Sequence, residues 1–435
     1  MRTQLVVAVA HFARLATLSA QPLTAREAGV RTYLSANFES GVSLLQRAVN
    51  IPSGTFNTAG VRAVGALYRQ ELDALGFATK WVELPPALRR AGHLVAEWNG
   101  AKAMPATKRL LLIGHLDTVF EGPGQRFARR DTVARGAGTA DMKGGDVAII
   151  MALRALKAVG ALDELKVTVI MTGDEEAAGR PLSASRKTLT ELARVSDAAL
   201  AFEGGDARTA TISRRGASGW ILTAKGRQGH SSAIFRDGSG YGAVFEAARI
   251  LNEFRERLGK ERYLTFNPGT IVGGTTVRYD SAEVNGTASG KTNIIAKDVV
   301  VQGDLRFLTD GQLDSARAAM RAIVADHLPG TTASISFDDG YPGMPPTDGN
   351  RALLNIFDQT SQALGYPAVD PLPPEQRGAG DVSFVGGIIP SLDGLGVAGF
   401  GAHSPEEGVY LPSLTMAALR AAVFMMRLSR GPEVQ

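Results

Sequence analysis

The chain has 435 residues, more than one hydrophobic core usually serves, so two or three domains are expected. Hydrophobic residues make up 44% of it and charged residues 21%, as in globular proteins, and its net charge of +4 is spread without the basic stripe that nucleic-acid binding requires. Because Cys is absent, disulfides, thiolate ligands and a Cys nucleophile are excluded, and any metal must be held by Asp, Glu and the six His.

Residues 1–22 have features of a secretion signal: an early Arg2, the apolar run LVVAVA and the small residues LSA before Gln21. His11 and Arg14 interrupt the apolar part, so the start of an ordinary amphipathic helix is an equally good interpretation. A signal would make the protein periplasmic or secreted, and without one it would be cytoplasmic. No later stretch has enough uninterrupted apolar residues to span a membrane.

Helical and strand-like segments alternate between residues 23 and 215. A helical region from about Val42 to Leu75, broken at Pro52, precedes the strand-like segments FATKWVEL, HLVAEWNG and KRLLLIGHLDTV. The last of these is continuously apolar, which is typical of a strand buried on both faces. The helix GGDVAIIMALRALKAVGAL and the strand LKVTVIMT follow. This order predicts an α/β catalytic domain with a mixed, mostly parallel sheet and flanking helices.

The pattern changes between residues 216 and 339. There, GWILTAKGR, GTIVGGTTVRY, DVVVQGDLRF and TASISFDD are strand-like, and helices are expected at about Gly242–Arg257 and Asp310–His327. We therefore expect an inserted α+β domain of the ferredoxin-like type. Residues 340–435 begin with the linker GYPGMPPTDGN and continue with a helix around Ala352–Gly365 and another after Pro412. This segment is expected to complete the first domain.

The stretch VTVIMTGDEEAAGR places Asp174, Glu175 and Glu176 side by side directly after a strand. Two like charges about 4 Å apart repel by roughly 1 kcal/mol in water and by more near a protein surface. A solvated turn tolerates this repulsion, so the stretch alone indicates no more than a loop. It becomes a candidate site if other segments supply cations for these acids to bind.

Four other segments contain possible metal ligands. His115 and Asp117 end a buried strand, where residues two apart point the same way and a carboxylate can fix the histidine tautomer. Asp141 lies in the Gly-rich turn RGAGTADMKGG before a helix, Glu203 ends the strand-like ALAFE, and His403 lies in the late loop GFGAHSPEEGVY. Each residue alone also fits an ordinary surface histidine, helix cap or loop.

The order and setting of these segments resemble the M20 family of metallopeptidases, which includes glutamate carboxypeptidases, aminoacylases, acetylornithine deacetylases and succinyl-diaminopimelate desuccinylases. The motifs IGHLDTV, GTADMKGG, TGDEE and DGLGVAGFGAHSPEE are most similar to the glutamate carboxypeptidase-like branch. The resemblance extends from about residue 40 to about residue 427 and includes all the motifs in order.

This resemblance implies a centre of two Zn²⁺ per subunit, for which cobalt or manganese could substitute. The implied ligands are His115, Asp141 and Glu203 for one metal, and Asp141, Glu176 and His403 for the other. Asp117 would orient His115, and Glu175 would stay off the metals as the general base. Nitrogen and oxygen ligands suit zinc where thiolates are absent.

The resemblance also implies roles in the insert. His230 would reach the active site of the partner subunit in a homodimer, and Asn293, Arg306 and, more weakly, Arg215 would contact the free carboxylate of the substrate. Gly380 belongs to the segment Gly378–Asp381, which resembles the substrate-side loop of the family.

Where glutamate-releasing relatives carry a basic residue at the end of the insert, this chain has Asp338 and Asp339. A neutral or aromatic residue is then as plausible a product as glutamate.

The implied function is a dizinc carboxypeptidase-type exopeptidase that cleaves an amide next to the free C-terminal carboxylate of a small peptide or N-acyl amino acid. An aminoacylase or dipeptidase of the same family is the alternative. An inactive metal-binding relative is a different class, against which the intact Glu175 argues. A serine hydrolase has little support, because GSGYGA lacks the spacing of a nucleophile elbow after a strand.

Overall fold

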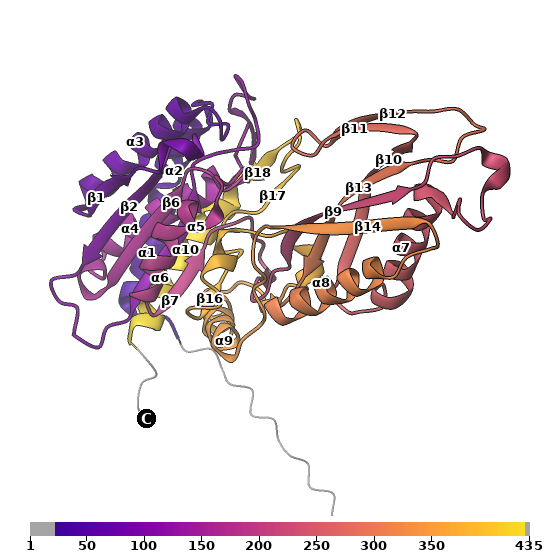
Figure 1. The fold of residues 1–435 in the computed structure, drawn as a ribbon. Helices are drawn as coiled ribbons and strands as arrows, with labels where there is room; N and C mark the ends of the chain where they lie inside the picture. The colour runs from indigo at the N-terminus through magenta and orange to yellow at the C-terminus, as the bar shows by residue number, and fades with distance from the viewer. Residues whose placement is uncertain (1–21, 431–435) are drawn as a thin grey trace, which may run out of the picture.

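The computed structural model describes residues 22–430, so the possible signal peptide lies outside the described residues except for its last position. Two parts lie side by side in Figure 1. The larger part combines residues before 216 with residues after 339, and the elongated smaller part is formed by the residues between them.

The larger part contains most of the helices. They are α1 (Ala25–Ala36), α2 (Phe38–Val49), α3 (Thr58–Leu75), α4 (Lys143–Ala158), α5 (Leu182–Ser185), α6 (Lys187–Arg194), α9 (Asp348–Ala363) and α10 (Leu411–Arg430). Its central strands are β1 (Ala78–Val82), β2 (His93–Asn99), β3 (Arg109–His115), β6 (Lys166–Thr172), β7 (Ala198–Ala201) and β16 (Ser391–Leu392). Short peripheral strands are β4 (Ala128–Arg130), β5 (Val133–Arg135), β8 (Thr209–Ala210), β15 (Asp370–Pro371), β17 (Gly399–Phe400) and β18 (Gly408–Tyr410).

The central sheet has six strands in the order β1-β2-β6-β3-β7-β16. Strand β3 pairs in parallel with β6 and β7, and β16 pairs in parallel with β7, whereas β2 pairs antiparallel with both β1 and β6. The predicted mixed, mostly parallel sheet with flanking helices is therefore confirmed.

Alternate residues of β3 enter two different apolar clusters. Leu110 and Leu112 pack with residues of α1, α2, α3, α4, α9 and α10, while Leu111 and Ile113 pack with residues of α6. The continuous apolar run thus belongs to a strand covered by helices on both faces, as the sequence predicts.

The smaller part has its own sheet and its own apolar cluster. Its elements follow in the order β9 (Gly216–Gly226), α7 (Gly242–Leu258), β10 (Thr265–Gly274), β13 (Asp298–Phe307), α8 (Asp310–Ala325) and β14 (Thr331–Asp339). The four strands pair antiparallel in the order β10-β13-β9-β14, which is the ferredoxin-like arrangement. Within residues 22–430, β14 has a strand partner on one side only.

One strand boundary differs from the expectation. The segment GTIVGGTTVRY was expected to form one strand, but β10 ends at Gly274, and β11 (Thr276–Asp280) folds into a hairpin with β12 (Asn285–Ser289). The pair Gly273–Gly274 provides the reason, because glycine weakens a strand and permits a bend.

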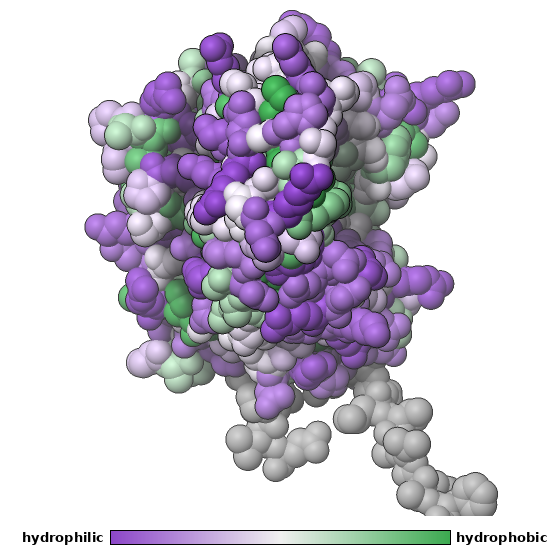
Figure 2. Space-filling model, turned by 45° about the vertical axis from the view of Figure 1, so that its right-hand side comes forward, coloured by the Kyte–Doolittle hydropathy of each residue, from purple (hydrophilic) through white to green (hydrophobic). Residues whose placement is uncertain are grey.

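Among the described residues, one helix is long and apolar enough to span a membrane. This is α10, in which 78% of the residues in the apolar window Leu411–Ser429 are buried inside the protein. Its apolar character is that of a central core helix packed on α4, α9 and α1. The face drawn in Figure 2 is mostly hydrophilic, with apolar residues in small separate patches.

Candidate active site

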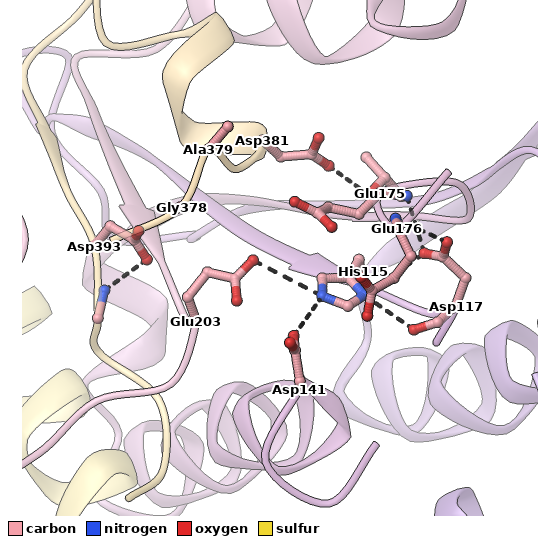
Figure 3. A network of polar contacts seen from close by, with 12 residues as sticks. His115, Asp117, Asp141, Glu175, Glu176, Glu203, Gly378, Ala379, Asp381 and Asp393 are labelled. Carbon is pink, nitrogen blue, oxygen red and sulfur yellow. Dashed lines mark hydrogen bonds and ion pairs between the residues drawn. The ribbon is translucent and has the colours of Figure 1, made fainter. Parts of the chain in front are cut away.

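Five acidic side chains singled out in the sequence lie around His115 near the carboxyl ends of the parallel strands (Figure 3). His115 is the last residue of β3, and Glu175 and Glu176 follow β6. Glu203 follows β7, and Asp141 precedes α4. Because these strands run in the same direction, segments distant in sequence reach one edge of the sheet, where α/β folds bind their ligands.

Two sets of three side chains share Asp141. In the first set, His115 Nε2 lies 3.2 Å from Asp141 Oδ1 and 3.8 Å from Glu203 Oε1. In the second, His403 Nε2 lies 3.1 Å from Asp141 Oδ2 and 3.2 Å from Glu176 Oε2. The two carboxylate oxygens of Asp141 therefore face two different histidines.

The residues present fit a pair of divalent cations. In each set, one potential ligand atom from every residue lies within 4.8 Å of the others. Glu176 Oε1 is buried without a hydrogen-bond partner in the described structure, as expected of an acid whose counter-charge is a cation. The donors are imidazole nitrogens and carboxylate oxygens, which transition-metal ions and zinc accept.

The family model described as peptidase family M20/M25/M40 matches residues 111–427, which include both sets of side chains. The chain belongs to this M20 peptidase family. It is a member of a family of metal-dependent peptidases and amidohydrolases, as the motifs predict, and its described residues carry a candidate metal-binding cluster.

Two curated relatives match most of the chain. Carboxypeptidase G2 of Pseudomonas sp. (strain RS-16) is 27% identical over 407 residues, which cover 90% of this chain and 89% of the relative. Succinyl-diaminopimelate desuccinylase of Acidovorax ebreus is 24% identical over 387 residues, covering 85% of this chain and 93% of the relative.

Solved structures share the fold at lower identity. Aminopeptidase PepT from Bacillus cereus has a TM-score of 0.73 and 19% identity, covering 90% of this chain and 99% of the PepT chain. The YXEP protein of Bacillus subtilis, described as a dinuclear metal-binding peptidase of the M20 family, has a TM-score of 0.61 and 14% identity, covering 91% of this chain and 99% of its own. These similarities establish the M20 fold.

Asp117 organises the site in a different way from the simple pairing expected with His115. The main-chain oxygen of Asp117 lies 3.0 Å from His115 Nδ1, closer than its carboxylate at 3.5 Å. The carboxylate accepts hydrogen bonds from the backbone N–H groups of Glu175 and Glu176, at 3.0 and 3.1 Å, and from Thr55 Oγ1 at 2.6 Å. Asp117 therefore holds both His115 and the Glu175–Glu176 turn.

Glu407 has a similar supporting role that the sequence analysis missed. Its buried carboxylate accepts hydrogen bonds from the N–H groups of Gly138, Ala140 and Asp141 at 2.9, 2.8 and 3.0 Å. It thereby ties the loop of His403 to the turn that presents Asp141. The only sequence signal was its place four residues after His403.

A buried charge network, also missed, lies behind the Glu175–Glu176 turn. Arg186 donates to Asp174 Oδ1 at 2.6 Å and to Asp381 Oδ1 at 2.7 Å, and all three side chains are buried. Arg186 also donates to the hydroxyl of Tyr341, which itself donates to the main-chain oxygen of Glu175 at 2.6 Å. Asp174, the first acid of the triplet, is therefore a structural residue.

The predicted substrate residues lie mainly in the insert. His230 is exposed and hydrogen-bonds Ser232 Oγ at 2.9 Å, and Asn293 is its near neighbour, since the Asn293 oxygen accepts from Ser231 N. Arg215 donates to Thr265 Oγ1, and Thr265 is the cross-strand partner of Arg306, which pairs with Asp304 at 2.9 Å. Neither group is part of the two metal-ligand sets.

Gly380 lies against the guanidinium of the buried Arg214, where a Cβ atom would come within 2.9 Å of Nη1. Arg214 donates to the oxygens of Gly378 and Ala379 and pairs with Asp393 at 2.6 Å. The loop expected to face the substrate is thus held by Arg214, the neighbour of the predicted Arg215.

The electrostatics reflect a shortage of positive charge. Burial raises the pKa of Glu176 to about 8 and that of Glu203 to about 7, and the nearby Asp141 charge adds to both increases. Burial also raises the pKa of Glu175 well above its usual range. Burial opposes ionisation of Asp141 too, but hydrogen bonds with His115 and His403 hold its pKa well below the usual range. The hydrogen bond with Asp141 raises the pKa of His403 to about 9.

We predict that the metal-free protein loses stability as pH rises from about 5.5 to about 8. The pKa values of Glu176, Glu203 and His403 are raised in the native state, so the native state still binds protons that the unfolded chain has released. The free energy of unfolding therefore falls as pH rises through this range. A divalent cation replaces those protons, so saturating Zn²⁺ should raise the melting temperature more at about pH 8 than at about pH 5.5. Equal shifts at both pH values in a thermal-shift assay would contradict this account.

Replacing Glu407 with Gln should lower metal affinity about 10–100-fold, because an amide NH₂ would then face a backbone N–H donor and loosen the Asp141 turn. Titration calorimetry measures the affinity, and circular dichroism checks the fold. Glu406→Gln is the matched control, since Glu406 is exposed and pairs with Arg135 on the surface. Wild-type affinity in a folded Glu407→Gln variant would remove the supporting role.

Proposed function

We propose that this protein is a two-zinc carboxypeptidase that hydrolyses an amide bond next to a free C-terminal carboxylate. The observation that carries this proposal is the pair of ligand sets sharing Asp141, with Glu175 beside them and in neither set. The similarity to carboxypeptidase G2 along 89% of that relative supports the carboxypeptidase assignment.

Zinc is the proposed metal because each set offers one imidazole and two carboxylates and the chain has no Cys. His115, Asp141 and Glu203 would hold one ion, and Asp141, Glu176 and His403 the other. When bound, two such ions acidify water and polarise the substrate carbonyl as Lewis acids. Cobalt or manganese, which accept the same ligands, would substitute.

Glu175 is the proposed general base. It takes a proton from the attacking water as the new C–O bond forms, and it gives that proton to the leaving nitrogen as the C–N bond breaks. Its backbone is fixed on two sides: its N–H donates to Asp117, and its oxygen accepts from Tyr341. This support aims the carboxylate without involving it in either ligand set.

The free carboxylate of the substrate is assigned to the insert, where Asn293, Arg306 and Arg215 supply an amide and two guanidinium groups. Asp338 and Asp339 do not carry unpaired charge toward this region, because Asp338 pairs with Arg180 at 3.3 Å and Asp339 with Arg317 at 2.7 Å. These acids therefore give no reason to reject an acidic product, and glutamate, neutral and aromatic residues all stay candidates.

An aminoacylase or dipeptidase of the same family is the second candidate function. It is favoured by the succinyl-diaminopimelate desuccinylase relative, 93% of which is covered and whose name denotes removal of an acyl group. The two functions share the metal site and differ in the group that is bound beside the scissile amide.

We also propose a homodimer formed through the insert, with His230 acting in the partner's site. His230 is exposed in the insert, which also exposes Phe235, Val244 and Phe245, whose side chains a partner would cover. The unpaired side of β14 is a second surface on which a copy of the chain could continue a sheet.

Glu175→Gln should lower kcat by at least about 10²–10⁴ on a panel of N-acyl amino acids while two zinc ions stay bound, because an amide cannot act as a base. Glu176→Gln should instead lose one ion, because it removes a ligand from one set only. Elemental analysis and a ninhydrin assay measure both properties. The reverse outcome, with zinc lost from the Glu175 variant alone, would exchange the two roles.

The same panel separates the candidate functions. With dipeptides added to the panel, the relative rates on N-acyl amino acids and on dipeptides rank the candidates. Amidation of the C-terminal carboxylate should abolish hydrolysis by a carboxypeptidase and by an aminoacylase alike, because both act next to that free carboxylate. Failure of the zinc-loaded wild type on every member would reject the proposed function.

His230→Ala should reduce kcat about 10²–10³, the usual cost of removing one donor to a developing oxyanion. Mixing His230→Ala subunits with Glu175→Gln subunits should restore activity, because a mixed dimer contains one site free of both defects. Each variant mixed with itself is the control. Absence of recovery, with subunit exchange demonstrated by differently tagged chains, would show that His230 does not act across a dimer.

A further inference from the structure

A cavity of about 530 Å³ lies beside the segment Glu175–Ala177, and none of its lining residues belongs to either metal-ligand set. Its lining consists of Phe56, Thr58, Arg62, Arg89 and Arg90. This volume is within the range of about 300–1,000 Å³ typical of small-ligand sites. The cavity therefore has room for part of a substrate.

Both walls of the cavity are joined directly to the active site. On one wall, Arg90 Nε donates to the main-chain oxygen of Ala177 at 2.6 Å, and Ala177 follows Glu176. On the other, Phe56 follows Thr55, whose hydroxyl donates to the Asp117 carboxylate at 2.6 Å. A substrate held at Glu175 and Glu176 therefore has this cavity next to it.

The charge of the cavity is positive. Arg62 is paired with Glu83 at 2.9 Å and adds little net charge. Arg90 donates to the main-chain oxygens of Ala177, Leu88 and Arg89, and its guanidinium lies 4.4 Å from the centre of the Phe56 ring. Arg89 is exposed, and within residues 22–430 neither Arg89 nor Arg90 forms an ion pair with a carboxylate.

Two further groups contribute to the electrostatic potential in the cavity. Thr58 is the first residue of α3, an 18-residue helix with no acid in its first turn, so the positive end of its dipole adds to the arginines. The acid on the Phe56 side is Glu121, whose Oε1 accepts from the Phe56 N–H at 3.0 Å. The exposed carboxylate of Glu121 is engaged with the backbone, so the positive charges of Arg89 and Arg90 exceed the negative charge on this side of the cavity.

We propose that this cavity is the subsite for the acyl side of the substrate and that it selects acyl groups carrying a carboxylate. The assignment rests on the proposed function, in which the insert binds the other side of the scissile amide. The guanidinium groups of Arg89 and Arg90 bind the carboxylate, and the Phe56 ring contacts the carbon chain that links it to the amide. The preferred substrates are thus N-acyl amino acids or peptides with an acidic group before the scissile bond.

The test compares two substrates that differ only in charge: the N-succinyl and N-succinamoyl derivatives of one amino acid that the wild type accepts. Wild-type kcat/KM should be about 10–100-fold higher for the succinyl compound, as expected for one or two hydrogen bonds to a charged group. Arg89→Gln should remove most of this preference, measured as the ratio of the two kcat/KM values. Arg90→Gln should lower the same ratio and should in addition slow both compounds, because it also loses the hydrogen bond to Ala177. Arg69→Gln, on the same helix α3 as Thr58 and paired with Asp73, is the matched control and should behave as wild type.

Each other outcome has a definite meaning. If the wild type hydrolyses both compounds with equal kcat/KM, the subsite is rejected while the proposed function stands. If Arg89→Gln leaves the ratio of the two kcat/KM values as it is in the wild type, Arg89 does not bind the acyl carboxylate, and the subsite is again rejected. Arg89 is the deciding position, because its side chain forms no hydrogen bond within residues 22–430 that the substitution could break. If the wild type hydrolyses neither compound nor any other panel member, it is the proposed function that fails.

Discussion

The constraint on which the site depends is an excess of buried negative charge. The carboxylates of Asp117, Asp141, Glu175, Glu176 and Glu203 gather around His115 near the carboxyl ends of β3, β6 and β7 (Figure 3), and His403 lies against two of them. Charged groups are costly to bury unless opposite charge is close. Arg186 and Arg214 supply permanent positive charge behind the site, where they pair with Asp174, Asp381 and Asp393.

The remaining acids have no permanent counter-charge, and this distinguishes the ligands from the framework. Asp174 keeps an ordinary ion pair with Arg186, whereas burial raises the pKa of Glu176 and Glu203 because no arginine or lysine reaches their oxygens within hydrogen-bonding distance in the described structure. Divalent ions bring the missing charge. The same turn therefore carries Asp174, whose charge is neutralised by Arg186, and Glu176, whose charge a metal ion would neutralise.

The fold and the grouping of the acidic and histidine side chains into two sets could be predicted because their signals are local. The apolar run of β3 and the position of His115 at its end follow from a few neighbouring residues, and the motif order identifies the family. The supporting residues could not be predicted, since their partners are distant: Asp381 is 195 residues from Arg186, and Glu407 is 266 from Asp141. The hairpin of β11 and β12 was missed because an apolar segment does not reveal a bend at two glycines.

The division of the larger part into two chain segments has a consequence for its synthesis. His403, Glu407 and α10 all follow the insert, yet α10 packs on α4 in the centre of the core. On the ribosome, the first 215 residues must wait with an incomplete core while the insert, which has its own apolar cluster, can already fold. The side chains of the second ligand set can therefore come together only after the last segment of the chain has been made, because His403 belongs to that set.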